Sequence, residues 1–153
     1  MDVLLSVLAS AAYMTVIEYA VHRWYMHRPK STAWREHSIE HHHEGRNEDY
    51  YLCPFWRSIF FFWILGLAPL LLLSLYGPII LGVLMVWWRF SWNQIHRICH
   101  GTGSNWVLAA ILCPWAWFVV QHHLKHHEKP TTNFGAIFFL TDTLMQTRYI
   151  EHD

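Results

Sequence analysis

Histidine is the residue that most constrains this chain, because twelve of its thirteen copies fall into four spaced groups. The groups are His22 with His27; His37 with His41, His42 and His43; His96 with His100; and His122 with His123, His126 and His127. Only His152 stands apart. A lone histidine is most often a hydrogen-bonded core or surface residue, but a neutral imidazole is also the usual nitrogen ligand for Zn, Fe, Cu or Ni. Four groups together therefore predict a metal site.

The spacing within the groups indicates how the rings are presented. Residues three or four apart share one face of a helix, so we expect His37 with His41, His96 with His100, and the set His123, His126 and His127 to point their rings the same way. His22 and His27 are five apart and do not share a face on an unbroken helix. Either Arg28-Pro29 ends the helix there, or the two rings bind different metals.

Chain length, net charge and cysteine content exclude several classes of protein. The 153 residues predict one domain spanning 1–153. The formal net charge is zero, and without a basic excess we expect no nucleic-acid partner. The three cysteines are scattered and contain no CxxC pair, so neither a disulfide framework nor a zinc ribbon is indicated. We interpret them as small buried hydrophobic residues.

Long apolar segments with at most one charged residue each predict an all-α integral membrane protein, a helical bundle with about three to four hydrophobic helices. The segments run over 3–21, where Glu18 is the one charge, 58–76, 78 to about 96, where Arg89 is the one charge, and 105–120. Met1-Asp2 lacks the basic start of a signal peptide, so we expect the first segment to be a retained span. The soluble alternative is a helical protein whose apolar helices are buried in its core.

The position of the histidines restricts the topology. If the first three segments cross a bilayer, His22, His27, His96 and His100 lie on one side, and a fourth crossing would carry His122 to His127 about 30 Å away. We therefore expect segment 105–120 to be re-entrant, interfacial or buried against the other helices. All eleven Lys and Arg residues lie on the histidine side or, like Arg89, within two turns of it. The positive-inside rule then predicts a cytosol-facing metal site.

The number of imidazoles predicts two metal ions, since ten or more rings exceed what one ion binds. The sequence holds a single ExxH motif, Glu40 to His43, whereas a carboxylate-bridged four-helix di-iron protein needs two. Glu18, four residues before His22, is a candidate to orient that ring as a hydrogen-bond acceptor or to snorkel to the interface. Asn93, Gln94 and Gln121 are further candidates for orienting imidazoles.

These motifs, taken in order, resemble the histidine boxes of the membrane-bound fatty acid hydroxylase/sterol desaturase superfamily. The resemblance runs from about Glu18 to Thr147 and includes Asn133-Phe134-Gly135 and a closing segment with Asp142. By position it implies ten metal ligands, namely His22, His27, His37, His41, His42, His96, His100, His123, His126 and His127. His43 and His122 fall just outside the boxes, and whether either binds metal stays open.

The resemblance implies a non-haem di-iron oxygenase that hydroxylates or desaturates an unactivated C–H position of a lipid, of the fatty acyl or sterol-like class, with O2. The cofactor would be two Fe ions, with zinc possible by mis-metallation because all-nitrogen sites favour it. The sequence contains no cytochrome b5-like domain, so we expect a separate electron donor, such as a ferredoxin, cytochrome b5 or reductase. The membrane would be the inner membrane of a bacterium or the endoplasmic reticulum of a eukaryote, and the oligomeric state is left open.

Two other functions remain. A carotenoid (beta-ring) hydroxylase is similarly compact and shares the HRxxMH-like opening, but its third box is more widely spaced than His96 to His100. A non-catalytic metal- or lipid-binding membrane protein is the alternative from another class. A metal carrier should place polar ligands through the depth of the bilayer, whereas the middle of every apolar segment here is uncharged.

Overall fold

The computed structural model describes residues 3–31, 33–42, 63–66, 75–102 and 105–150, and every regular element among these residues is helical. The elements are α1 (Val3–Val21), η1 (His22–Met26), η2 (Arg35–His41), α3 (Gly77–Cys99), α4 (Trp106–Leu112), α5 (Ala116–Glu128) and α6 (Leu140–Leu144). The all-α prediction is therefore confirmed for this part of the chain. Most of the predicted apolar segment 58–76 lies outside it.

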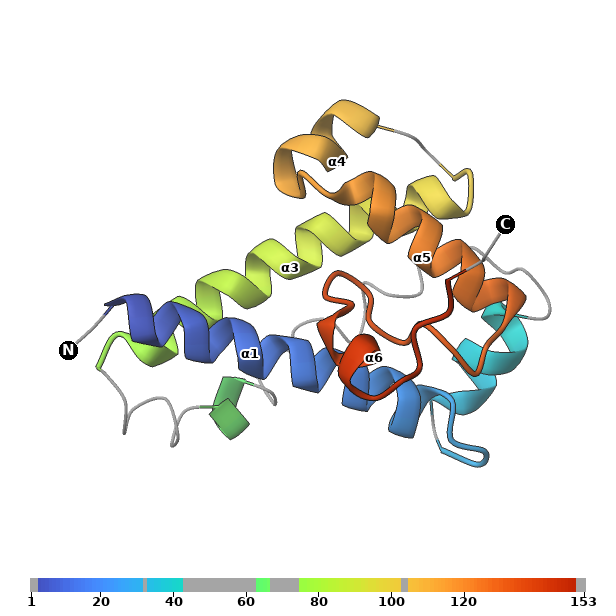
Figure 1. Cartoon of the computed structure of the whole chain (residues 1–153), viewed down its shortest axis with the longest axis horizontal. Coiled ribbons are helices and arrows are strands. Elements are labelled where there is room, and N and C mark those ends of the chain that lie inside the picture. The colour runs from blue at the N-terminus through green and yellow to red at the C-terminus, as the bar shows by residue number, and fades with distance from the viewer. Residues whose placement is uncertain (1–2, 32, 43–62, 67–74, 103–104, 151–153) are drawn as a thin grey trace.

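The two long helices, α1 and α3, lie side by side and run in the same direction (Figure 1). Met14 of α1 packs against Leu81 and Met85 of α3, and all three side chains are buried. Pro78 lies in the first turn of α3, where a proline is tolerated because its missing N–H has no helical partner. Because the helices are parallel, both arrive at the end of the molecule where the histidines lie.

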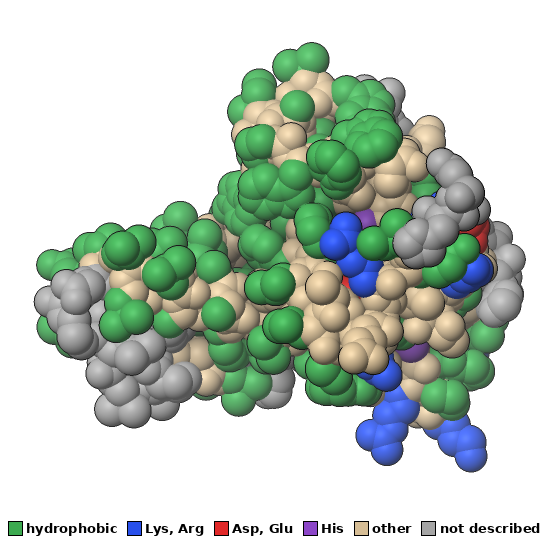
Figure 2. Space-filling view, in the orientation of Figure 1, with side chains coloured by type: hydrophobic (Ala, Val, Ile, Leu, Met, Phe, Trp, Pro, Cys, Tyr) green, Lys and Arg blue, Asp and Glu red, His purple; other side chains and the backbone are tan. Residues whose placement is uncertain are grey.

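The polarity of α1 is inverted relative to a helix on a water-soluble protein. Ser6, Ser10 and Glu18 are buried on the face toward the rest of the chain, whereas Leu4 is 70% exposed and Leu8 is 59% exposed. Small residues allow close helix contact in membranes, where lipid covers the apolar side. Figure 2 shows hydrophobic side chains along the arm formed by α1 and α3 and over α4, with the basic side chains gathered at the other end.

One described helix, over Val3–Met26, is by itself long and apolar enough to cross a membrane. Helices α4 and α5 pass the same test only as a pair, and they meet at 104° across the break around Pro114. The predicted segment 105–120 is thus bent rather than one straight span, as expected for a re-entrant or interfacial segment. The number of membrane helices remains a prediction.

A second hydrophobic core joins α3, α4 and α5 behind the site. Trp92 and Ile95 of α3, Cys113 between α4 and α5, and Val119 of α5 are buried together with Ile137 from the loop that follows α5. The loop from Lys129 to Phe139 then leads into α6 and lies beside α1 and α5 (Figure 1). This loop takes part in the site.

Candidate metal centre

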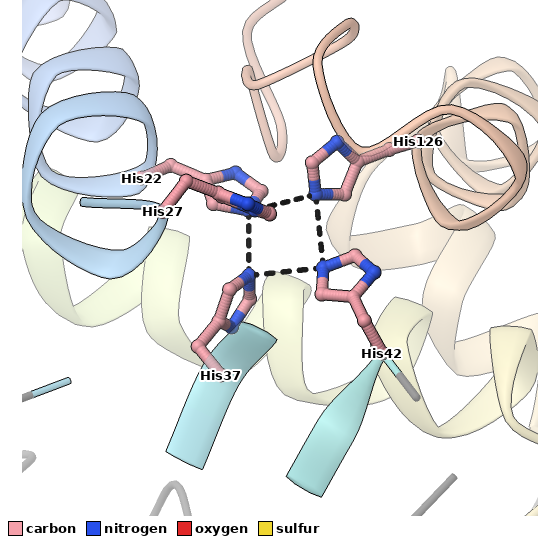
Figure 3. Close-up of side chains that lie close together, drawn as sticks. All are labelled: His22, His27, His37, His42 and His126. Atoms are coloured by element: carbon pink, nitrogen blue, oxygen red, sulfur yellow. Dashed lines mark hydrogen bonds between the residues drawn. The ribbon is translucent and has the colours of Figure 1, made fainter. Parts of the chain in front are cut away.

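Histidines from each of the four sequence groups converge at the common end of α1 and α3. Their ligand atoms form two groups, and within each group these atoms lie within 4.8 Å of one another. The five-histidine group contains His22, His27, His37, His42 and His126. The four-histidine group contains His41, His96, His100 and His123. Figure 3 shows the rings of the five-histidine group turned toward one another from three separate segments.

The two π-helical turns explain how rings five residues apart meet. In η1 the amide of His27 donates to the carbonyl of His22 at 3.1 Å, and beyond η2 the amide of His42 donates to the carbonyl of His37 at 3.1 Å. This i to i+5 bonding, which occurs mostly at functional sites, puts His22 with His27 and His37 with His42. The helix does end here, at Met26 with His27 as its C-cap, just before Arg28-Pro29 as one alternative expected, and the wide π-helical turn at this end brings the two rings together. The other alternative, different metals, is wrong, because His22 and His27 belong to one group.

The rings of His37 and His41 lie side by side as expected, with centroids 5.4 Å apart, but they serve different groups. These residues are four apart, but His37 belongs to the five-histidine group and His41 to the four-histidine group. His41 instead meets His96 of α3, with 3.2 Å between their Nε2 atoms. Segment 35–42 therefore serves both groups.

Helix α5 also serves both groups, and its rings lie together as expected, with the centroids of His123 and His127 4.6 Å apart. His126 joins the five-histidine group and His123 the four-histidine group. His127 belongs to neither, but its Nε2 lies 3.0 Å from that of His123, and its ring centroid lies 4.3 Å from that of His42. All ten predicted ligands thus come together, with His127 between the two groups.

Backbone carbonyls fix the orientation of two rings. The Nδ1–H of His22 donates to the carbonyl of Phe134 at 2.6 Å, and the Nδ1–H of His126 donates to the carbonyl of Thr132 at 2.6 Å. Each ring then carries its lone pair on Nε2, which faces the centre of the group. An outer hydrogen bond of this kind is typical of metal-binding histidines.

The Nε2 atoms of the five-histidine group lie within hydrogen-bonding distance of one another. The Nε2 atom of His126 lies 3.1 Å from the Nε2 atoms of both His27 and His42. The Nε2 atom of His22 lies 2.9 Å from that of His37. Because His22 and His126 both direct lone pairs inward, a bound cation would satisfy the group. All-nitrogen donors fit Zn, Fe, Cu or Ni, so the two groups could hold metal ions.

Burial keeps these imidazoles neutral, as metal binding requires. Loss of solvent lowers the pKa of His27 to about 4. Burial, with His22 nearby, lowers the pKa of His37 well below its usual value, and burial with His126 does the same for His42. The rings are therefore available as ligands at neutral pH.

His122, whose role the sequence left open, faces away from both groups. Its Nε2 lies 3.1 Å from Oδ2 of Asp142, and both side chains are buried. Burial alone would raise the pKa of Asp142, but hydrogen bonds from His122, Thr147 and the amides of Gly135 and Phe134 outweigh it and lower that pKa. His122 thus contacts an anion instead of the metal groups. His43 and His152 lie outside the described residues.

Glu18 does not accept a hydrogen bond from His22, nor does it reach solvent. Its Oε1 accepts from Trp88 Nε1 at 2.6 Å and from the amide of Ile137 at 2.7 Å, and its Oε2 accepts from the amide of Phe138 at 2.9 Å. The carboxylate therefore joins α1, α3 and the loop after α5. Glu18 is linked to His22 indirectly by that loop, which also contains Phe134, the residue whose carbonyl holds the His22 ring.

The other predicted orienting residues show no such contact among the described residues. Gln121 is exposed on α5. Asn93 and Gln94 are half-buried on α3, and no hydrogen bond from either to a described histidine is present. Their role in orienting imidazoles remains a prediction.

Sequence reasoning missed the groups that do orient the rings. The carbonyls of Thr132 and Phe134 are backbone atoms, so no residue type marks them. Asp142 carried a signal, because it is the one charged residue between Pro130 and Thr147. A lone carboxylate in so apolar a segment needs buried hydrogen-bond donors, and here it has them.

Comparison with known proteins adds a single match. A family model described as fatty acid hydroxylase matches residues 7–147, a range that contains all four histidine groups and Asp142. No curated protein and no solved structure matches the chain.

Proposed function

The chain belongs to the fatty acid hydroxylase family, and on that premise we propose that it is a membrane-bound, non-haem di-iron oxygenase. Family membership supports an oxygenase-type enzyme that acts on lipids, of the hydroxylase or desaturase kind. The proposal adds the two iron ions, O2 as oxidant and an unactivated C–H position of a fatty acyl or sterol-like lipid. Zinc in a purified sample would reflect mis-metallation.

The observation that carries the proposal is the pair of adjacent all-nitrogen groups. A structural zinc site uses about four ligands, whereas ten imidazoles from four segments meet here. We assign the five-histidine group to one ion and the four-histidine group to the other, with His127 as a ligand between them. Bound iron would supply the activation of O2 and the oxidation of the C–H bond.

The protein itself would hold the metal ions, orient the ligand rings and shield the centre from water. His22 and His126 are held by backbone carbonyls. The ring of Trp92 lies 4.9 Å from that of His123, and the ring of Phe134 lies 5.8 Å from that of His22. These aromatic side chains exclude water from the side of the centre that they cover. Water exclusion protects an oxidising site from side reactions.

The inverted polarity of α1 supports embedding in a membrane. Exposed Leu4, Leu8 and Val16 would face lipid, while Ser6 and Ser10 face the protein. The histidines would lie at the bilayer boundary where the basic residues gather, on the cytoplasmic side by the positive-inside rule. A lipid chain could then approach the centre from the bilayer.

In hydroxylation, one oxygen atom of O2 enters the C–H bond and the other leaves as water, which consumes two electrons and two protons. In desaturation, both oxygen atoms leave as water, the substrate loses two hydrogen atoms, and two electrons from the donor and two protons are again consumed. We propose a separate ferredoxin, cytochrome b5 or reductase as the electron donor. A carotenoid ring hydroxylase remains the second candidate substrate class.

The test is expression of the full chain in a lipid-rich host with a competent reductase, followed by mass spectrometry of total lipids. The test variant is His126→Ala, which removes one ligand. The matched control is Lys125→Ala, which changes the neighbouring surface residue paired with Glu128. We expect a lipid that has gained one oxygen or lost two hydrogens, present with wild type and Lys125→Ala and absent with His126→Ala. No such product among fatty acids, sterols and carotenoids would favour the non-catalytic alternative.

A further inference from the structure

One loop supplies both carbonyls that orient the five-histidine group. Thr132 accepts from His126 and Phe134 accepts from His22, each at 2.6 Å. The two carbonyls are two residues apart in the sequence, whereas the two rings come from η1 and α5. The position of this loop therefore bears on both rings at once.

Asp142 holds the loop from the side away from the metal groups. Its Oδ1 accepts from the amide of Phe134 at 2.8 Å, and its Oδ2 accepts from the amide of Gly135 at 2.6 Å. Its side chain is fully buried. Phe134 thus donates its N–H to Asp142 and accepts a hydrogen bond at its carbonyl from His22, so a single residue separates the carboxylate from the ring.

The carboxylate is itself held by two side chains. Thr147 Oγ1 donates to Oδ1 at 2.7 Å, and His122 Nε2 donates to Oδ2 at 3.1 Å. His122 immediately precedes His123, so the contact also ties Asp142 to α5. Hydrogen bonds to a charged acceptor are among the stronger ones in proteins. Four donors on one buried carboxylate leave it little freedom to move.

We propose that Asp142 is a positioning residue for the five-histidine group, acting through Phe134 on His22 and through the same loop on His126. The inference rests on the proposed function, since it presumes that the group binds metal. Asp142 is proposed to act on one of the two metal positions and not on the other. Loss of the carboxylate should weaken the ion at the five-histidine group and spare the ion at the four-histidine group.

The experiment titrates the metal-free full chain, in detergent or lipid nanodiscs, with Co²⁺ alone and follows the visible absorption of the bound ion. The Co²⁺ binding step that is weakened in His22→Ala is assigned to the five-histidine group. The step that is weakened in His96→Ala is assigned to the four-histidine group. Asp142→Asn is the test variant because it keeps the shape of the side chain and replaces one acceptor oxygen with a donor. Thr141→Ala is the matched control. Thr141 is the adjacent residue, is also buried, and its hydroxyl donates to the carbonyl of Thr15 at 3.2 Å.

We expect Asp142→Asn to weaken the step identified by His22→Ala by about 10- to 100-fold, the usual cost of losing an outer hydrogen-bond partner. The other step should stay at its wild-type affinity, and Thr141→Ala should leave both unchanged. A merely structural role would lower the affinity of both steps together. If Asp142→Asn does not fold, Thr147→Val removes one donor to the carboxylate and should give a smaller weakening of the same step.

Three results would overturn the inference: equal weakening of both steps, weakening confined to the step identified by His96→Ala, or no change in either step. A wild-type chain that binds no Co²⁺ at all would contradict the proposed function itself, and this inference with it. That failure is distinguishable, because it is seen before any variant is compared.

Discussion

The two nitrogens of an imidazole have different partners throughout this site, and that difference sets what each ring can do. His22 and His126 give their Nδ1 protons to carbonyls and keep Nε2 for the centre. His122 instead gives its Nε2 proton to Asp142. Three histidines that look alike in the sequence thus have two distinct roles.

That distinction predicts different outcomes for neighbouring residues on α5. His122→Gln should keep two metal ions per chain, because its amide can still donate to Asp142. His123→Gln should lose one ion, because His123 belongs to the four-histidine group. Elemental analysis of the purified variants measures the ratio. Equal loss in both would mean that His122 is a ligand.

Gly135 has no room for a side chain. A Cβ added there would collide with the backbone carbonyl of Phe138 and would lie 2.8 Å from Oδ2 of Asp142, which is closer than carbon and oxygen approach. We expect Gly135→Ala to lower the stability by about 1 to 3 kcal/mol, as overpacking does. The matched control is Gly82→Ala in α3, where the nearest atom would be 3.5 Å away and alanine favours the helix. Thermal unfolding of both variants provides the comparison, and equal midpoints would contradict the reading of this loop.

At the scale of elements, a change of helical period distributes the ligands. The π-helical turn η2 presents His37 with His42 in the five-histidine group. His41, whose ring centroid lies 5.4 Å from that of His37, belongs to the other group. The same widening in η1 brings His22 to His27, with ring centroids 5.0 Å apart. The two π-helical turns η1 and η2 thereby allow histidines from four segments to surround two metal positions.

This assignment predicts which histidines act together in Co²⁺ binding. His37→Ala and His42→Ala should weaken the same binding step, and His41→Ala should weaken the other. Each loss should exceed about 100-fold, since removal of a mere hydrogen-bond partner of a ligand costs up to that much. If His37→Ala and His41→Ala weakened the same step, the chain would have an α-helical turn at this place.

Much of the site was predictable from the sequence, because convergence follows from residue type and order. Ten of the histidines were expected to meet, and they do. Their division into two groups was not predictable, since the spacing rule assumes a regular α-helix and nothing in REHSIEH marks a π-helical turn. Glu18 was placed beside His22 by the same rule, but its oxygens accept hydrogen bonds from Trp88, Ile137 and Phe138 instead.

At the scale of the whole molecule, the fold separates an apolar half from a ligand-bearing end. Helices α1 and α3 run in parallel from one end to the other (Figure 1), so each delivers its histidines to the same place. The bend of 104° between α4 and α5 turns the chain, and α5 brings the last histidine group to the same place. Metal ions would then tie α3, α5 and the segments around η1 and η2 together.

Acid should destabilise the metal-free protein. The pKa of His27 is lowered to about 4 in the fold, against about 6.5 in an unfolded chain. As the pH falls from about 6.5 to about 4, the histidines of the unfolded chain become protonated while the buried rings of the folded chain stay neutral. The free energy of unfolding therefore decreases. His37 and His42 shift in the same direction. Thermal unfolding at pH 7.5 and pH 5 after chelation measures this, and an unchanged midpoint would contradict it.

The most decisive single measurement is diffraction from crystals of the iron-reconstituted protein at the iron absorption edge. We predict two anomalous peaks, one enclosed by His22, His27, His37, His42 and His126, and the other by His41, His96, His100 and His123. A single peak, or peaks away from these rings, would contradict a two-metal centre.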